Sequence, residues 1–590
     1  MDGDCCQRPG GLQLTKTLLD RITLRPGARV LDVGCGKGNT VSFLQEDRGL
    51  DAWGIDLEAP EAPCLVRGDA AHLPWEDGWF DAVLMECSLS CMVEPETILE
   101  EVRRVLRTDG VLLVTDLYTR GSEATLWGQV GRVEGLEEQL ARLAAAGFSA
   151  EEVQRYDEAL ISYWAALVFE HGTEEARRCL GANGACDISR WGYYAASCTL
   201  LPVKESVRRW QLQRAEETVR RARKDSYFYR RHLANFDLSA GLASLPFTDG
   251  HMLAEQGAAM LWVPQEETVR IRTICTSGSS GQPKRIWFTE AELERTVRFF
   301  AQGMEPIVAG GRDVAILMSD DKPYSIASLL REGLNRIGVR GLILGRFRGQ
   351  EALEAVPKGC GCIVGLPADV LYLARHRPEL CPGSVLLSAD YIPPALVEAI
   401  VAVWHCPVFC HYGMTETGYG LAVQCGRLEG QHLRWQDYLV EIIDPDTGAV
   451  LPDGCEGEIV LTSLFQGRAM PLIRYRTGDI GSLAAGPCGC GSWLPCLGPI
   501  RGRYRNLRSA LNIHRLDDVL FSLPEVAGFY ACLTREGLSI SVEGEIPDHV
   551  AEELRTLSPV PVHIRRGEAP PWETKEKRRL AEEDAGTGCI

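Results

Sequence analysis

A glycine-rich turn near the start of the chain is the first segment whose residue types and spacing suggest chemistry. The run Val30-Leu-Asp-Val-Gly-Cys-Gly-Lys-Gly places three glycines directly after a strand-like segment, at Gly34, Gly36 and Gly38. Glycine tolerates positive backbone angles and the close approach of a ligand. Asp56 ends the next strand-like run, where a carboxylate can hold ribose hydroxyls, and Asp69 follows the third, where it can accept a hydrogen bond from an adenine amino group. Together these elements predict a site for a nucleoside-bearing ligand.

A second loop, residues 276–284, combines hydroxyls and glycines with a terminal cation. It reads Thr276-Ser-Gly-Ser-Ser-Gly-Gln-Pro-Lys and follows a strand-like run over residues 268–274. The amides and hydroxyls of such a loop can surround phosphate oxygens. The loop is not the G-x-x-x-x-G-K-[ST] phosphate loop, since Lys284 is followed by Arg285. A Ser/Gly linker without chemistry is the alternative.

Thiols and imidazoles form the third chemical group. Cys488 and Cys490 lie in a C-x-C pair, and Cys425 and His432 precede them, which makes a complete tetrahedral set for zinc. A closed set of four ligands predicts a structural metal rather than a catalytic one; unmetallated thiols are the alternative, and Cys496 is a spare ligand. A further group could also be taken as metal ligands, but it adjoins apolar strand-like segments and is expected instead to be buried in the core: Cys360, Cys362, His405, Cys406, Cys410 and His411.

The elements that must position these residues alternate between strands and helices. Strand-like runs cover residues 29–33, 52–56, 80–85 and 110–116, with a closing strand at 191–201. This rhythm predicts a parallel sheet covered by helices. Residues 98–106 are apolar at helical spacing, and Thr108-Asp-Gly is expected to end that helix. Residues 203–231 carry mixed charges, which predicts a solvated helix joining two domains. A second, longer series of strands and helices begins after Phe247.

Length and composition limit the class of protein. A chain of 590 residues needs two or three cores, and its 45% hydrophobic and 24% charged content is that of a folded globular protein. The formal charge of −19 argues against nucleic acid as a partner. We find no apolar run long enough to span a membrane and no signal-like start, so we expect a cytoplasmic protein with no membrane partner. The 22 cysteines are then expected to be reduced thiols or metal ligands.

Across residues 10–202 the order of motifs resembles the class I methyltransferases that use S-adenosylmethionine, including the phrase Leu73-Pro-Trp-Glu-Asp-Gly-Trp-Phe-Asp-Ala. The resemblance implies that Asp32 and the glycine turn hold the methionine part, Asp56 the ribose and Asp69 the adenine. An NAD site is the alternative, but its last glycine would stand at position 39, which is Asn39. No acceptor-specific base stands out: Glu86, Ser88 and His72 lie near the expected cleft mouth, where isolated polar residues are more often structural or solvent-facing. The methyl acceptor is therefore left open.

From about residue 226 to the end, the chain resembles phenylacetate-coenzyme A ligases and the related deazaflavin-coenzyme adenylating synthetases. The resemblance rests on the loop at 276–284 and on five motifs in the family's order: Phe228-Tyr-Arg-Arg-His, Leu245-Pro-Phe-Thr, Tyr412-Gly-Met-Thr-Glu-Thr, Val440-Glu-Ile-Ile-Asp-Pro-Asp-Thr-Gly and Leu472-Ile-Arg-Tyr-Arg-Thr-Gly-Asp-Ile. It implies an enzyme that uses ATP and releases pyrophosphate to form an adenylate. Some relatives look similar at the thiol cluster and carry structural zinc.

The resemblance also implies a role for individual residues. The ATP phosphates would contact Ser277, Ser279, Ser280 and Lys284. The adenine would lie against Ser388, Ala389 and Asp390, near the motif that begins at Tyr412. Thr415 would contact the α-phosphate, and Glu416 would hold Mg²⁺. Asp479, assisted by Arg503, would bind the ribose hydroxyls. Lys575, in Pro571-Trp-Glu-Thr-Lys, would stabilise the negative charge that develops during adenylation.

The C-terminal segment departs from the family's pattern. Family members rotate a small domain, here beginning around Arg501, so that a second face assists thiol attack. The hinge position is Arg505, the next family Asp is Asn506, and the loop Arg508-Ser-Ala-Leu-Asn-Ile-His looks shortened. Adenylation is therefore better supported than transfer to coenzyme A.

We thus expect an α/β protein with four parts: a Rossmann-like methyltransferase domain (1–203), a charged helical linker (204–225), a large adenylate-forming α/β domain (226–500) and a small mobile α+β domain (501–590). The expected function of the second part is adenylation of a small carboxylic acid, which an aromatic acid would satisfy, followed by thioester formation with coenzyme A. The expected function of the first part is methylation of the same or a related metabolite. The partners are that small-molecule carboxylate and the methyl acceptor. The alternatives are nucleotidyl transfer to a coenzyme-like acceptor without coenzyme A, and a half that only senses a ligand.

Overall fold

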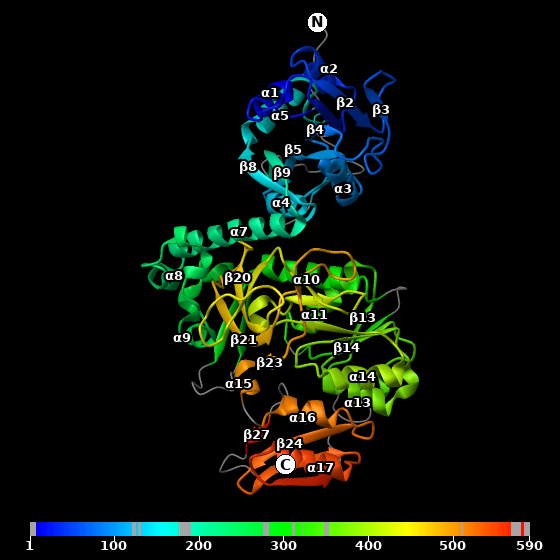
Figure 1. Ribbon diagram of the computed structural model, residues 1–590, viewed down its shortest axis with the longest axis vertical. Coiled ribbons are helices and arrows are strands. Elements are labelled where there is room, and N and C mark those ends of the chain that lie inside the picture. Colours follow the sequence, from blue (N-terminus) through cyan, green and yellow to red (C-terminus); the bar gives the residue numbers. More distant parts are fainter. Residues whose placement is uncertain are drawn as a thin grey trace. The chain divides into compact units, whose positions relative to one another are not determined.

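The computed structural model describes residues 8–120, 125–127, 131–174, 176, 190–274, 283–308, 313–320, 322–346, 353–508, 511–567 and 580–582. The chain forms two compact units, Met1–Trp210 and Gln211–Ile590, whose elements are labelled in Figure 1. Among the described residues, no helix is both long enough and apolar enough to cross a membrane.

The first unit is built on a seven-stranded sheet in the order β3-β2-β1-β4-β5-β9-β8. Its strands are β1 (Arg29–Val33), β2 (Asp51–Asp56), β3 (Leu65–Arg67), β4 (Phe80–Glu86), β5 (Leu106–Thr119), β8 (Phe148–Arg155) and β9 (Trp191–Leu200). The first five are parallel, and β9 runs antiparallel to both β5 and β8. The parallel strands and the closing strand predicted from the sequence are thereby confirmed. A separate two-stranded ladder pairs β6 (Thr125–Trp127) with β7 (Gly131–Val133).

Helices cover both faces of this sheet because successive strand residues point to opposite sides. On one face, Leu31 and Val83 pack with α3 (Pro95–Val105) and α4 (Leu136–Ala145). On the other, Val30 and Leu84 pack with α1 (Gly11–Leu19), α2 (Asn39–Glu46) and α5 (Asp157–His171). The strands are therefore buried on both faces, which explains their continuous apolar runs.

Two expectations from the sequence need correction. Residues 107–109 do not separate α3 from the next strand: β5 already begins at Leu106, which is buried and pairs with Phe80, and the chain bulges outward before Val111 pairs with Ala82. The charged segment forms α7 (Val203–Asp225) and then α8 (Tyr227–His232), but it is not simply solvated. Ala215, Thr218 and Val219 are buried, because one face of α7 packs within the second unit while its charges lie on the other faces.

Among its described residues, the second unit contains an eight-stranded main sheet, two four-stranded sheets and a β-hairpin. The main sheet has the order β13-β12-β14-β15-β16-β17-β18-β22 and is parallel from β13 to β16. Its strands are β12 (Val314–Leu317), β13 (Gly341–Ile343), β14 (Cys362–Gly365), β15 (Ser384–Leu387), β16 (Val408–Tyr412), β17 (Ala422–Gln424), β18 (Gln431–Leu433) and β22 (Cys496–Leu497). Helices α10 (Glu290–Met304) and α11 (Ile326–Arg336) lie on one face, and α13 (Pro367–His376) and α14 (Pro394–Trp404) lie on the other (Figure 1).

The second sheet is antiparallel and carries several motif residues. It joins β19 (Tyr438–Ile443), β20 (Gly457–Ser463), β21 (Tyr475–Gly481) and β23 (Gly502–Arg503). The hairpin pairs β10 (Arg270–Ile274) with β11 (Lys284–Phe288), and α9 (Gly250–Met260) packs against it. The loop predicted to bind phosphate thus connects two paired strands.

The C-terminal part has a small sheet in the order β26-β25-β24-β27, made of β24 (Gly528–Thr534), β25 (Gly537–Glu543), β26 (Val562–Arg566) and β27 (Ala581–Glu582). The helices α15 (Tyr504–Leu507), α16 (Ile513–Leu520) and α17 (Asp548–Leu557) complete it. Leu516 and Phe521 belong to the same apolar cluster as Leu396 and Ile400 of α14, so this part shares a core with the main sheet.

Candidate functional site

The first candidate site lies where β1 and β2 end. Gly34, Gly36 and Gly38 all have positive φ angles, of 82°, 52° and 86°. A Cβ at Gly34 would lie 2.6 Å from the Cβ of Ser88, so the turn can pass there only without a side chain. The amide of Gly36 donates a hydrogen bond to Asp56 Oδ2 at 3.0 Å, which joins two of the predicted elements. Asp69 lies in the exposed turn after β3, where its Oδ1 accepts from the Ala71 amide.

Asp32 lies beneath this turn in a network of buried charges. It is 3% exposed, and burial, with a smaller contribution from Glu86, raises its pKa to about 7. Glu86, at the end of β4, is itself buried and pairs with Arg8 at 2.7 Å and accepts from Thr15 at 2.7 Å. Burial raises the pKa of Glu86. Glu86 is therefore held by the N-terminal segment through Arg8, which no sequence motif indicated.

The other two polar residues expected near this cleft are structural or exposed. The Ser88 hydroxyl donates to the Val33 carbonyl at 2.9 Å and is buried. His72 is exposed. Within the described part of the chain, no contact positions either residue to act as a general base toward the methyl acceptor.

The second candidate site joins the hairpin, the main sheet and the antiparallel sheet. Lys284, the first residue of β11, donates to Glu416 Oε1 at 3.1 Å. Glu416 lies in a 3-10 turn, η7 (Thr415–Thr417), that follows β16. Tyr475, at the start of β21, donates to the same carboxylate oxygen at 3.0 Å and accepts from Lys284 at 3.3 Å. Three elements far apart in the sequence thus converge on one carboxylate.

The electrostatics keep that carboxylate charged. Burial alone would raise the pKa of Glu416, but Lys284 opposes it and the net effect is a lowered pKa. Burial and the adjoining carboxylate raise the pKa of Tyr475 well above its ordinary value, so its phenol stays protonated and donates. Arg468 donates to the Glu416 carbonyl at 2.8 Å, which fixes the turn. An anionic Glu416 can therefore act as a ligand for a hard cation.

A second carboxylate lies close by. Asp479 on β21 pairs in register with Arg503 on β23, and the Arg503 Nε lies 3.0 Å from Asp479 Oδ1. The Tyr412 hydroxyl donates to Asp479 Oδ2 at 2.8 Å. Asp479 lies four residues after Tyr475 on the same face of β21, which places this group near the Glu416 group. The predicted residues Tyr412, Asp479 and Arg503 thus lie in direct contact.

The segment expected to contact adenine follows β15. Ala389 has a positive φ of 70°, so the chain turns sharply between Ser388 and Asp390. The Ser388 hydroxyl lies 2.7 Å from the Nδ1 of His411, which is on the neighbouring strand β16. Thr415 begins the turn η7 and is partly exposed.

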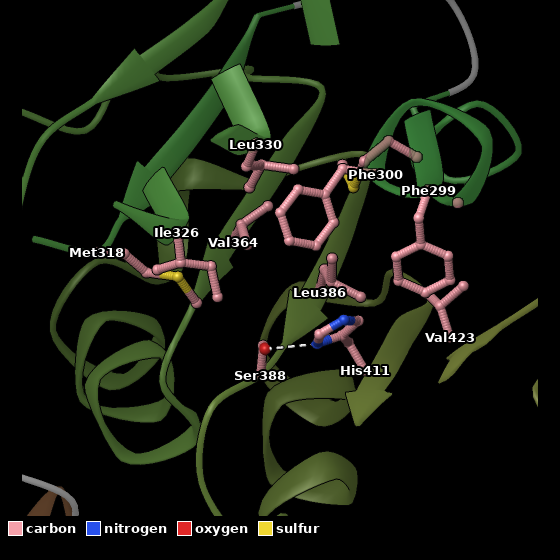
Figure 2. Close-up of a pocket in the computed structure, with 12 residues that line it drawn as sticks. Phe299, Phe300, Met318, Ile326, Leu330, Val364, Leu386, Ser388, His411 and Val423 are labelled. Carbon is pink, nitrogen blue, oxygen red and sulfur yellow. Dashed lines mark hydrogen bonds between the residues drawn. The ribbon is translucent and has the colours of Figure 1, made fainter. Parts of the chain in front are cut away.

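An apolar pocket adjoins this segment (Figure 2). It is lined by Phe299, Phe300, Gly303 and Met304 of α10, Ile326 and Leu330 of α11, Met318, Val364, Leu386 and Val423 from the sheet side, and Ser388 and His411. Only the last two carry polar side chains. Burial lowers the pKa of His411 to about 4, and Arg434 adds to the effect, so the imidazole is neutral at neutral pH.

The predicted thiol cluster also assembles. The ligand atoms of Cys425, His432, Cys488 and Cys490 lie within 4.8 Å of one another. The Sγ atoms of Cys425 and Cys488 are 3.6 Å apart, and Cys490 Sγ is 3.4 Å from His432 Nε2. Of the group expected in the core, Cys360, Cys362, Cys406 and His411 are buried and Cys410 is partly buried. The expectation is wrong for His405, which is exposed because it caps the C-terminus of α14 with a φ of 52°.

Four of the predicted site residues lie outside the described residues: Ser277, Ser279, Ser280 and Lys575. Three participants were not singled out from the sequence. Tyr475 lies inside the motif that begins at Leu472, so that motif was the sequence signal that could have identified it as a site residue. Arg468 and Arg8 belong to no such motif, and only the fold brings them to Glu416 and Glu86.

Comparison with known proteins assigns each unit to a family. Residues 31–114 match the methyltransferase domain family, and residues 263–466 match the AMP-binding enzyme family. The crystal structure of 2-hydroxyisobutyryl-CoA ligase in the postadenylation state resembles this chain with a TM-score of 0.54 and 19% identity, covering 65% of this chain and 91% of that one. This likeness concerns the fold. The two family matches define an AMP-forming enzyme that carries a methyltransferase domain ahead of it in the sequence.

Relatives of known name narrow the assignment. A phenylacetate-coenzyme A ligase of Thermus thermophilus is 26% identical over 385 residues, which cover 61% of this chain and 84% of that protein. A demethylmenaquinone methyltransferase of Beutenbergia cavernae is 33% identical over 175 residues, which cover 27% of this chain and 70% of that protein. The chain belongs to the AMP-forming, phenylacetate-coenzyme A ligase-like enzymes and carries a fused class I methyltransferase domain. The predicted α/β fold class and this pairing are confirmed.

Proposed function

We propose that the second unit activates a small carboxylic acid with ATP and passes the acyl group to coenzyme A, and that the first unit uses S-adenosylmethionine to methylate the same or a related metabolite. One observation supports the adenylation step above the others. Glu416, paired with Lys284 and Tyr475, adjoins Asp479, which is paired with Tyr412 and Arg503. A charged carboxylate beside a cation and a second carboxylate beside an arginine suit the triphosphate and the ribose of one nucleotide.

In the proposed adenylation, a carboxylate oxygen of the acid attacks the α-phosphorus of ATP, and the bond from that phosphorus to pyrophosphate breaks. Mg²⁺, when bound, neutralises phosphate charge. Glu416 would hold that ion, and Lys284 would turn from Glu416 to the phosphates. Thr415 would contact the α-phosphate, and Asp479 would hold the ribose hydroxyls. We assign the remaining phosphate contacts to Ser277, Ser279 and Ser280, and the stabilisation of developing charge to Lys575.

The lining of the apolar pocket supports an acid whose carbon skeleton is also apolar. It adjoins Ser388, which with Ala389 and Asp390 would contact adenine, so an acid bound there would have its carboxylate near the nucleotide. Aromatic and methionine side chains favour aromatic or branched groups. An aromatic acid is one such ligand.

The glycine turn of the first unit supports the proposed use of S-adenosylmethionine, which supplies an electrophilic methyl group. Gly34 and Gly38 stand where a Cβ would meet Ser88 and Leu65, and Gly36 faces open space. The turn can therefore approach a ligand closely. Asp56 would bind the ribose, Asp69 the adenine, and Asp32 the methionine part. Methyl transfer depends chiefly on alignment of the two reacting atoms, so the unit does not need a strong base.

The thiol cluster fits structural zinc. Tetrahedral zinc with bonds of about 2.3 Å to sulfur holds its thiolates roughly 3.8 Å apart. The distances of 3.6 Å between Cys425 and Cys488 and 3.4 Å between Cys490 and His432 are close to this spacing. Zinc there would link the segment after β17 to the segment before β22.

The test is pyrophosphate release from ATP across a panel of carboxylic acids, with and without coenzyme A. Release that depends on an acid, with a thioester formed when coenzyme A is added, supports the proposal. Release without thioester formation would instead support nucleotidyl transfer to another acceptor. The departures from the family pattern at Arg505 and Asn506 agree with that alternative. Labelled methyl transfer from S-adenosylmethionine to the accepted acid or its thioester tests the other half. Binding of S-adenosylmethionine without transfer would favour a sensor.

A further inference from the structure

One polar atom in the apolar pocket lacks a partner. Within the part of the chain that the structure describes, His411 Nε2 is buried and makes no hydrogen bond. The histidine as a whole is 7% exposed. Leaving a polar atom buried and unpaired is unfavourable, and most such atoms in folded proteins find a partner. A ligand that supplies the missing hydrogen bond would remove this penalty.

The ring is held so that this atom faces the pocket. Its other nitrogen, Nδ1, is engaged by Ser388 at 2.7 Å. The rings of Phe299 and Phe300 each lie with centroids 6.0 Å from the imidazole. Figure 2 shows Ser388 on one side of the imidazole and the apolar side chains, with Leu386 among them, on the other. Because both sides of the ring are fixed, Nε2 cannot turn away to another partner.

Water is a poor substitute for a ligand at this position. A buried water needs two to four polar partners. Of the pocket's side chains only Ser388 and His411 are polar, and they already bond to each other through Nδ1. The missing partner is therefore a single polar group on an otherwise apolar ligand, such as a hydrocarbon with one polar substituent.

We propose that His411 Nε2 hydrogen-bonds to a hydroxyl group carried on the apolar body of the substrate acid, so that the enzyme selects hydroxylated carboxylic acids. The inference rests on the proposed adenylation and names its substrate class. A hydroxyl suits the site because it both donates and accepts, and so pairs with Nε2 whichever imidazole nitrogen carries the proton. A purely apolar acid would leave Nε2 unpaired.

The experiment uses the full chain and matched acids. Pyrophosphate release is measured with phenylacetate and its three ring-hydroxylated isomers, and with 4-methylpentanoate and its 2-hydroxy derivative, which separates aromatic from aliphatic bodies. In at least one pair, we expect kcat/KM for the hydroxylated acid to exceed that of its parent by about tenfold or more, since sites built to bond a hydroxyl discriminate strongly against its absence. In His411→Phe that ratio should fall towards one, and His411→Gln, which keeps a polar end, should retain part of it.

Cys410→Ala is the matched control, because Cys410 precedes His411 on β16 and does not line the pocket. Its ratio should equal that of the unmodified enzyme. Parents accepted as well as hydroxylated acids would overturn the inference and leave the adenylation intact, as would an unchanged ratio in His411→Phe. Silence towards every acid would refute the adenylation itself. Should His411→Phe not fold, the ratio in His411→Gln and calorimetric binding of each pair to the unmodified enzyme decide the matter in the same way.

Discussion

The ammonium group of Lys284 lies 3.1 Å from the carboxylate of Glu416, although 131 residues separate the two positions in the chain. We expect Glu416→Gln to reduce ATP–pyrophosphate exchange by about 100-fold and to raise the Mg²⁺ concentration needed for half-maximal rate, because a neutral amide is a weaker ligand for a hard cation. The measurement is exchange rate against Mg²⁺ concentration. Glu332→Gln on the exposed side of α11 is the control. An exchange rate in Glu416→Gln equal to that of the unmodified enzyme would show that Glu416 does not hold Mg²⁺.

Asp479 and its two partners predict a graded effect on ATP binding. Asp479→Asn should raise KM for ATP more than it lowers kcat, since the residue would bind ribose rather than the reacting phosphorus. Tyr412→Phe, which removes only the 2.8 Å hydrogen bond that positions Asp479, should raise KM by a smaller factor. Initial rates over a range of ATP concentrations measure both. A fall in kcat alone, with KM unchanged, would contradict the ribose assignment.

Local pattern was enough to predict the first unit's core. The runs at β1, β2, β4 and β5 are apolar because each strand is buried on both faces, and a parallel sheet is the arrangement that requires this. The turn after Gly34 was equally legible, since a positive φ needs glycine. In contrast, the start of β5 was misplaced: the sequence predicts that the strand begins at Gly110, after Thr108-Asp-Gly, but it begins at Leu106, which already pairs with Phe80.

Contacts made by tertiary structure were not predictable in this way. Arg8 contacts Glu86, which is 78 positions away in the sequence, and Arg468 contacts the Glu416 carbonyl, which is 52 positions away. No sequence periodicity predicts either pair. The composition of α7 indicated solvation, but a helix with charges on most positions can still bury one narrow face, as Ala215 and Val219 do. His411 was expected only as a core residue, and its unpaired Nε2 is visible only once the pocket is formed.

The thiol cluster predicts one zinc per chain. Cys425→Ser should lower the bound zinc, measured by mass spectrometry of the purified protein, from about one equivalent towards zero, because three ligands hold zinc less tightly than four. The thermal unfolding temperature of the second unit should fall with it. Cys381→Ser, at an exposed cysteine outside the cluster, is the control. Zinc-free protein with the unmodified sequence, purified without chelators, would refute the assignment.

Asp32 predicts a pH-dependent cost to the first unit. Its pKa is raised to about 7 by burial, so the folded unit binds this proton more tightly than the unfolded chain. The resulting stability is fully present below the ordinary pKa of an aspartate and is lost as pH rises through about 7. Asp32→Asn, which stays neutral, should therefore unfold at a higher temperature than the unmodified protein already at pH 5, and the difference between the two proteins should be about 5–10 °C larger at pH 8 than at pH 5.

Thermal unfolding without added ligand measures this difference, and the transition that S-adenosylmethionine shifts upward identifies the first unit. The same substitution should weaken S-adenosylmethionine binding, because the residue would hold the methionine part. A difference in unfolding temperature that is equal at pH 5 and pH 8 would show that the ionisation of Asp32 does not limit stability.

Two glycines separate the role of the turn in binding from its role in folding. Gly36 and Gly78 both have positive φ angles, of 52° and 63°, and a Cβ at either would meet nothing within 4 Å. Alanine at each position should therefore cost a similar amount of stability, about 1 kcal/mol, from backbone strain alone. Only Gly36 lies in the turn proposed to hold S-adenosylmethionine, so Gly36→Ala should weaken its binding by about tenfold or more, whereas Gly78→Ala should leave the affinity unchanged. Calorimetric titration of the two variants makes the comparison at matched stability. Equal affinities would mean that the ligand does not approach the turn, and the cofactor assignment of the first unit would fail even though its fold remained that of a methyltransferase.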